Sequence, residues 1–197
     1  MKFMNKYSAS FFLTIICSHS SSVLSDIKLS IDAETNLKGW KFNQGDMELE
    51  LLQRTPDQTR GFFLARGFST IVANDIATSC VFQTIVRNKG SETRGKPIVV
   101  SLKKWKILKN SKSLPLKLKE DWNQEWADTR VKPSAQLAFR WATFPTDQTF
   151  NPAGDYNWGM ISFGLQPGES FDLNIHWNVA EKSNQAIIKK MQCPEDK

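Results

Sequence analysis

The stretch FDLNIHWN, residues 171–178, decides the fold class, because every second residue in it is large and apolar. Phe171, Leu173, Ile175 and Trp177 alternate with polar residues. Strict alternation of this kind is typical of a β-strand that buries one face and turns the other to water. Strands with one solvated face build antiparallel sheets, so the chain is expected to be mainly β.

The same two-residue period recurs along the chain. Clear half-buried strands are expected at 27–33, 47–51 and 137–141, and weaker strands at 80–88, 98–108, 158–165 and 185–192. Within 98–108 the alternation changes phase, which predicts a bulge near Lys103 and Lys104. Trp141 and Trp177 fall on apolar strand sides and are expected in the core, and the candidates for solvent exposure are Trp122, Trp126 and Trp158.

Two helices are expected among these strands. The sequence TPDQ at 55–58 has a Thr cap, a Pro in the first helical position and a Gln in the third, and predicts a helix to about Ala65. A second short helix is expected over 119–128. About eight strands with two inserted helices and no β-α-β rhythm predict one antiparallel β-sandwich, immunoglobulin-like, over residues 26–197. An α+β arrangement is the alternative.

The N-terminus has the features of a cleavable signal peptide. Lys2 and Lys6 precede the apolar run 11–17, and small uncharged residues follow it. The run has about half of the roughly twenty residues that cross a bilayer, so no transmembrane anchor is expected. Cleavage before Asp26 predicts an exported protein, periplasmic or secreted. The alternative is a lipoprotein, with Cys17 as the site of a lipid anchor.

Cleavage would remove one of the three cysteines and leave Cys80 and Cys193. Two cysteines in an oxidising compartment usually form one disulfide bond. Each lies in phase with apolar neighbours in its predicted strand, as an internal bridge requires. The sequence therefore predicts a Cys80–Cys193 disulfide that closes a loop of more than a hundred residues.

The charge of the chain excludes one class of partner. Without the first 25 residues it has 24 Lys and Arg against 20 Asp and Glu, a net charge near +4, which is too small for a nucleic-acid-binding protein. Part of the excess lies in Lys103, Lys104, Lys106 and Lys109, which could contact an anionic surface. No motif for a cofactor is present, so none is expected.

Enzymatic chemistry finds little support in the sequence. His176 is the only histidine after cleavage, and no Gly-x-Ser-x-Gly motif accompanies it. Carboxylate pairs of the type that glycosidases use can be formed by Glu48 with Glu50 or by Asp121 with Glu125, which leaves a hydrolase of envelope glycans as an alternative. The spacing of these acids is common in any chain with 20 of them.

A copper carrier is the second alternative. Its soft ligands would be His176 and Met160, with Met47 and Met191. The sequence contains no pair of residues at metal-ligand spacing, and methionines on apolar strand faces ordinarily pack in the core. No metal site is therefore predicted.

The segment 145–157 is the strongest candidate for a binding site. It is expected to be a long loop that leads into Trp158, and its aromatic rings and amides suit a carbohydrate or a peptide. The candidate ligand-binding residues are Asp147, Phe150, Asn151, Asp155, Tyr156, Asn157 and Trp158. An aromatic cap over the end of the sandwich would use the same residues. The expected function is non-enzymatic binding of a protein or an envelope component.

Overall fold

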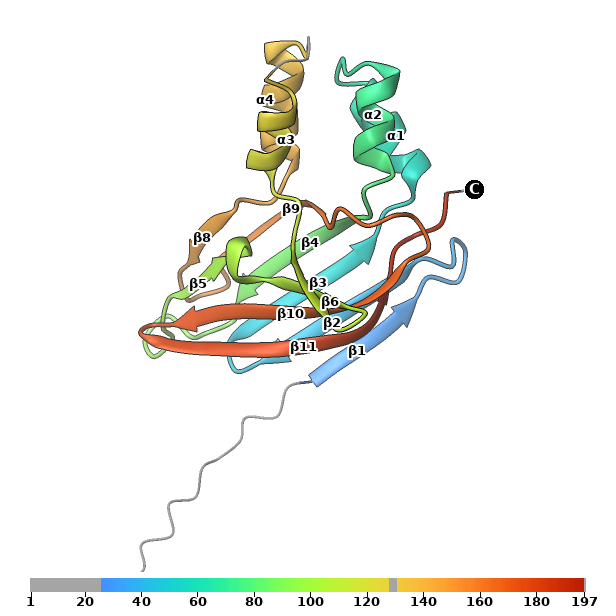
Figure 1. The fold of residues 1–197 in the computed structure, drawn as a ribbon. Coiled ribbons are helices and arrows are strands. Elements are labelled where there is room, and N and C mark those ends of the chain that lie inside the picture. The colour runs from blue at the N-terminus through green and yellow to red at the C-terminus, as the bar shows by residue number, and fades with distance from the viewer. Residues whose placement is uncertain (1–25, 128–130, 197) are drawn as a thin grey trace, which may run out of the picture.

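The computed structural model describes residues 26–127 and 131–196. In these residues the protein is mainly β, with two antiparallel sheets and four α-helices (Figure 1). The predicted sandwich-like pair of sheets is confirmed, whereas the immunoglobulin-like topology stays a prediction. The expected signal peptide at 1–25, with Cys17, lies outside the described residues.

The first sheet has five strands in the order β1-β2-β3-β4-β9. Their bounds are β1 Asp26–Ile31, β2 Lys38–Gln44, β3 Met47–Gln53, β4 Val81–Asn88 and β9 Tyr156–Ser162. In β3 the expected alternation is confirmed, because Met47, Leu49 and Leu51 are fully buried and the residues between them are not. This alternation turns one face of the sheet to the core and the other face toward solvent.

Strand β1 departs from its prediction. The alternation at 27–33 predicted a half-buried strand, yet all six residues of β1 are exposed. Ile27 and Leu29 pair with Phe42 and Trp40 and so lie on the core-facing side of the sheet. They stay exposed because β1 is the outermost strand, and a two-residue period shows which side of a strand is apolar but not whether a second layer reaches it.

The second sheet is built around β10, Ser170–Val179. Strand β11, Lys182–Gln192, pairs with one edge of β10, and β5, Ile98–Ser101, and β6, Lys106–Lys109, both pair with the other edge. The outer strands are β7, Lys112–Pro115, beside β6 and β8, Asp147–Phe150, beside β5.

The bulge predicted near Lys103 and Lys104 is instead a short 3₁₀ helix, Leu102–Lys104, which divides the predicted strand 98–108 into β5 and β6. Both strands continue along the same edge of β10. In the gap between them the Nε1 of Trp105 donates a hydrogen bond of 2.9 Å to the carbonyl oxygen of His176. The indole thus replaces a missing strand hydrogen bond.

The main hydrophobic core lies between the two sheets. Large side chains from both sheets meet in it, including Phe42, Phe82, Trp105, Phe171 and Trp177. The predicted core position of Trp177 is confirmed. The predicted disulfide between Cys80 and Cys193 is also confirmed, and both cysteines belong to this core.

Four α-helices stand together at one end of the sheets (Figure 1). They are α1 Pro56–Leu64, α2 Thr70–Ala77, α3 Lys119–Glu125 and α4 Pro133–Ala142. The predicted capping box of α1 is present, since the Thr55 side chain accepts from the amide of Gln58 and the Gln58 side chain accepts from the amide of Thr55. The helix expected at 119–128 is confirmed as α3.

The strand predicted at 137–141 is wrong, because these residues belong to α4. The buried residues of α4 are Ala135, Phe139 and Ala142, spaced by four and three as on one face of a helix. Pro133 occupies the first helical turn, where its missing amide proton costs nothing. Helix α2 was not predicted; Ser69 caps its N-terminus.

The helices form a second hydrophobic core of their own. Phe139 of α4 lies at its centre, with ring contacts to Phe63 of α1, to Phe68, and to Trp122 and Trp126 at α3. Both tryptophans at α3 are buried, although the sequence had made them candidates for exposure. The two helix pairs are therefore one packed unit.

Replacement of both Cys80 and Cys193 by Ser is expected to lower the free energy of unfolding by about 5 kcal/mol. The cross-link spans 113 residues of sequence, and its removal restores the conformational entropy of that loop in the unfolded chain. In a domain of this size the melting temperature should fall by about 10–20 °C. Calorimetry of the double variant and of the dithiothreitol-treated protein measures this loss. A shift below 3 °C in both would contradict the prediction.

Candidate functional site

The structure separates the aromatic residues of the predicted binding segment. Phe150 is fully buried and stacks on Phe144 in the core, so it cannot contact a ligand. Tyr156 and Trp158 lie on the outer face of the first sheet, with 53% and 58% of their surface exposed. The prediction of a thirteen-residue loop is wrong, because β8 and the first two residues of β9 occupy six of its positions and leave only 151–155 between the two strands.

The polar residues of that segment hold the segment together. The Asp155 carboxylate accepts a 2.8 Å hydrogen bond from the amide of Asn151. The Asn157 side chain donates to Oε1 of Gln148 at 2.6 Å and accepts from the amide of Trp158 at 2.8 Å. The sequence of this segment alternates too weakly for its strands to be predicted. The hydrogen bonds of its polar side chains stabilise the turn between β8 and β9.

Asp147 is likewise engaged within the protein. Its carboxylate accepts from the Ser101 hydroxyl and lies 3.3 Å from Nζ of Lys103. The Ser101 hydrogen bond and the Lys103 charge hold the pKa of Asp147 below its ordinary value. Lys109 forms an ion pair with Glu169. Two of the four lysines proposed for an anionic surface are therefore already paired.

An aromatic groove lies beside Trp158, where the end of α4 meets β9. It has a volume of about 420 Å³ and is lined by Phe62, Arg66, Ser134, Leu137, Ala138, Trp141, Ala142 and Trp158. Trp141 is 81% exposed, which contradicts its predicted place in the core, and Leu137 is 46% exposed. Two tryptophans with open faces thus share one groove.

Helix α4 presents this apolar surface because it has two apolar faces. Ala135, Phe139 and Ala142 are buried against the other helices. Leu137 and Trp141, four residues apart, lie on another side of the same helix and are exposed. A helix of ten residues needs only one apolar face to pack, so the second one is available for a ligand.

Close backbone contact fixes α4 against β9. The amide of Phe144 donates a 2.9 Å hydrogen bond to the carbonyl of Met160, and Thr143 and Met160 form a parallel bridge. A Cβ atom on Gly159 would lie 2.4 Å from the nitrogen of Phe144. Glycine is required at this position so that the helix end can approach the strand, and this approach places Trp141 near Trp158.

Arginine supplies the charge at the groove. The guanidinium of Arg66 lies 3.3 Å from the ring centroid of Phe62 and donates a 2.9 Å hydrogen bond to the Phe62 carbonyl. On the neighbouring part of the sheet, Arg87 lies 4.8 Å from the ring of Tyr156. Both cations are held by aromatic faces, which fixes their positions on the surface.

The carboxylate pair of Glu48 and Glu50 is occupied by cations. Nζ of Lys41 lies 3.0 Å from Glu48 and 2.7 Å from Glu50, and Glu48 also lies 3.4 Å from Lys89 and 3.6 Å from Arg87. Partial burial raises the pKa of Glu48, but hydrogen bonds and charge from Lys41 and Lys89 outweigh it and leave the pKa below its ordinary value. A general acid needs the opposite shift.

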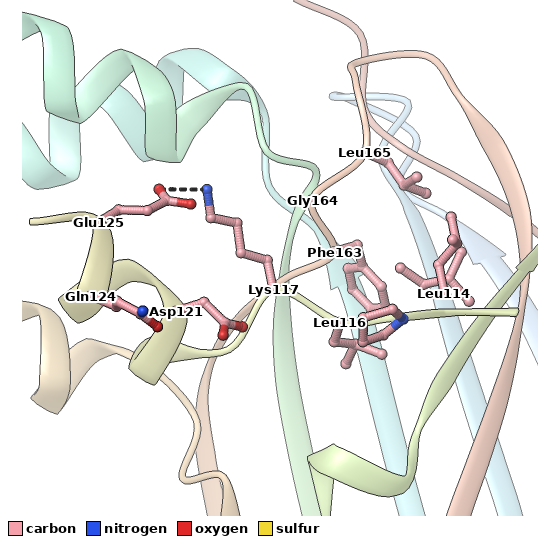
Figure 2. A pocket seen from close by; sticks show the side chains of 11 residues that line it. Leu114, Leu116, Lys117, Asp121, Gln124, Glu125, Phe163, Gly164 and Leu165 are labelled. Atoms are coloured by element: carbon pink, nitrogen blue, oxygen red, sulfur yellow. Dashed lines mark hydrogen bonds and ion pairs between the residues drawn. The ribbon is translucent and has the colours of Figure 1, made fainter.

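The second carboxylate pair lies on α3 beside a cavity of about 610 Å³ (Figure 2). Asp121 accepts a 2.8 Å hydrogen bond from the amide of Leu118, and Glu125 forms a 2.8 Å ion pair with Lys117. Nζ of Lys117 also lies 3.5 Å from the ring of Trp122. Figure 2 shows apolar side chains, among them Leu165, across the cavity from these acids. Both acids therefore connect α3 to the residues just before it, Lys117 and Leu118.

The proposed copper ligands are not brought together. Met47 and Met191 are buried between the sheets, Met160 lies in the helix core, and His176 is on the outer side of the second sheet. Across residues 26–127 and 131–196, no group of three His, Cys, Asp or Glu could hold a metal ion. The arrangement gives copper binding no support.

Comparison with protein-family models, with curated proteins and with solved structures finds no match for this chain. None of the helices in the described parts of the chain has the length and apolar character to cross a membrane. The function must therefore be argued from the aromatic groove itself. Sequence reasoning found Trp158 but missed Phe62, Arg66, Leu137 and Trp141; Pro133 followed by apolar residues at helical spacing was the available signal.

Replacement of Glu48 by Gln is expected to make the protein less sensitive to acid. The folded protein holds the pKa of Glu48 below its ordinary value of 4.5, so the wild-type carboxylate stabilises the fold above this pH. This contribution is lost as the pH falls through the pKa of the folded state. The difference in unfolding free energy between wild type and variant should thus shrink between pH 7 and pH 3 in urea titrations. Glu92→Gln, at an exposed loop position, is the control, and a constant difference would contradict the prediction.

Proposed function

We propose that the protein is an exported, non-enzymatic binding domain that holds an apolar segment of a protein partner in the aromatic groove. The observation that carries this proposal is the exposure of Trp141 and Trp158, at 81% and 58%, on the same groove. Tryptophan is highly buried on average, and an exposed apolar cluster marks an interaction site. Trp and Arg are also the residues that contribute most to protein interfaces.

The lining of the groove favours a peptide over a carbohydrate. Sugar recognition needs several free hydrogen-bonding side chains beside the aromatic ring, because each hydroxyl loses its water on binding. The amide and the carboxylate that come just before Trp158 in the chain, those of Asn157 and Asp155, form hydrogen bonds within the protein. Apart from Ser134 and Arg66, the side chains that line the groove are apolar or aromatic. Apolar side chains of a partner suit this surface.

Export is proposed from the sequence of the first 25 residues, and the Cys80–Cys193 disulfide supports it. An exported binding domain can act on a secreted protein or on a protein of the cell envelope. The hydrolase and copper-carrier alternatives lack comparable support, because the carboxylate pairs are engaged in structural contacts and the soft metal ligands lie apart.

The groove is tested by a photo-crosslinking amino acid placed at Leu137 in the native, exported protein. A discrete cross-linked species is expected at this position and not at Ile71, which is 75% exposed on α2 outside the groove. The double variant Trp141→Ala and Trp158→Ala should lose the species, since truncation of an interface tryptophan commonly costs about 2 kcal/mol, or about 30-fold in Kd.

Both tryptophans are exposed, so the double variant should keep its fold, as circular dichroism and the melting temperature can establish. Equal cross-linking at Leu137 in the wild type and the double variant would rule out the groove as the binding site. The absence of a specific species at Leu137 in the wild type would do the same.

The mature protein purified from its native compartment is expected to begin at Asp26. Its intact mass should correspond to residues 26–197 less two hydrogens for the disulfide bond. A mass that starts at Cys17 with an added lipid would support the lipoprotein alternative. The mass of the full chain would contradict cleavage altogether.

A further inference from the structure

Arg54, between β3 and α1, is a partly buried cation that has no partner among the described residues. Its Nε atom is buried and has no hydrogen-bond partner, and within the described ranges no Asp or Glu lies at ion-pair distance from its guanidinium. In contrast, Arg60 contacts Asp57, Asn74 and Asp196. A buried charge that lacks a hydrogen-bond partner carries a large desolvation cost.

The alternation of β3 explains the position of Arg54. Leu51 and Gln53 turn inward, and Gln53 is fixed there by hydrogen bonds with the amide of Lys38 at 2.7 Å and the carbonyl of Gln192 at 2.6 Å. The next residue therefore continues the outer side of the strand. The backbone amide of Arg54 donates to the carbonyl of Val81 at 3.1 Å, which fixes the chain as it enters α1.

A cavity of about 490 Å³ lies against Arg54 at the end of the first sheet that is next to α1. It is lined by Ser30, Ile31, Asp32, Thr35, Leu37, Lys38, Gly39, Leu52, Gln53, Arg54, Gln58 and Gln83. It does not share a residue with the aromatic groove. Strands β1 to β4 and the first turn of α1 all contribute to it.

The polar groups of this cavity include several free hydrogen-bond donors. The Oε1 atom of Gln58 accepts from the amide of Thr55, so its amide nitrogen is the group left for a ligand. The Gln83 carboxamide forms no hydrogen bond within the described parts of the chain, and it comes from the strand position paired with Leu52. With the guanidinium, these groups offer several donors to one site, which suits an acceptor with more than one oxygen.

The acid in the cavity, Asp32, forms no ion pair with Arg54. The Oδ1 atom of Asp32 is instead held by its own turn, where it accepts hydrogen bonds from the amide and the hydroxyl of Thr35, at 2.8 and 2.7 Å, and from the amide of Glu34 at 3.1 Å. Partial burial lowers the pKa of Arg54. The guanidinium nevertheless stays protonated, because its pKa lies far above neutral. The positive charge is left for an external anion.

We infer that this cavity is an anion-binding subsite, in which the Arg54 guanidinium binds two oxygens of a carboxylate or phosphate group and Gln58 and Gln83 donate to the same group. Arginine matches this geometry because its planar donors form two parallel hydrogen bonds with such groups. The subsite is separate from the aromatic groove, so it stands whether or not the groove binds a protein.

The test is an NMR titration of the 15N-labelled mature protein, with the arginine Nε–H signals assigned through the backbone. Inorganic phosphate, acetate and chloride are added in separate series at equal ionic strength. The Arg54 signal is expected to shift to saturation with phosphate or with acetate, and not with chloride. Saturation with phosphate alone identifies a phosphate site, and saturation with acetate identifies a carboxylate site.

Arg54→Gln should weaken the binding of the active anion at least about tenfold, followed through the backbone amide of Gln83. Arg94→Gln, which makes the same charge change at an exposed loop position, is the matched control and should bind as the wild type does. Gln83→Ala should weaken binding while Arg54 is kept, so the proposal can be tested even if Arg54→Gln does not fold. A wild-type Arg54 signal that does not saturate with either oxyanion, or that shifts equally with chloride, overturns the proposal.

Discussion

The close approach of Gly159 to the backbone of Phe144 is the contact on which the helical end of the molecule depends. Phe139 and Ala142 pack in the helix core, and Phe144 packs between the sheets, so six residues of chain join the two cores. The hydrogen bond from Phe144 to Met160 fixes that junction on β9. The junction brings Trp141 and Trp158 to the same groove, so the groove is already formed without a ligand.

The fold class could be predicted from the sequence because a sandwich buries alternate residues over long strands. Residues 171–178 carry this period almost without exception, and they form the central strand of the second sheet. Residues 137–141 show why a short period misleads. Leu137, Phe139 and Trp141 fit one face of a strand, but they also fit two faces of a helix. The features that favour the helix are Pro133 and the spacing of the buried residues 135, 139 and 142.

The candidate site was only partly predictable, because its members come from segments far apart in the chain. Tyr156 and Trp158 were identified by composition, and both are exposed. The side chains of the neighbouring Asp155 and Asn157 form hydrogen bonds within the protein, because the residue types that bind ligands also stabilise turns. Arg54 has no local feature that distinguishes it from other arginines. Its significance lies in missing partners, which a sequence does not show.

The disulfide bond divides the chain into a part that lies within a covalently closed ring and a part that does not. Residues 80–193 form a closed ring that contains all of the second sheet and the strands β4 and β9 of the first. Strands β1 to β3, with α1 and α2, lie outside the ring and are held to it by packing and hydrogen bonds. A single backbone cut inside the ring leaves both fragments joined, whereas a cut just before Cys80 leaves β3 attached to β4 through noncovalent contacts only. Most residues that line the Arg54 cavity thus belong to the part of the chain outside the disulfide ring.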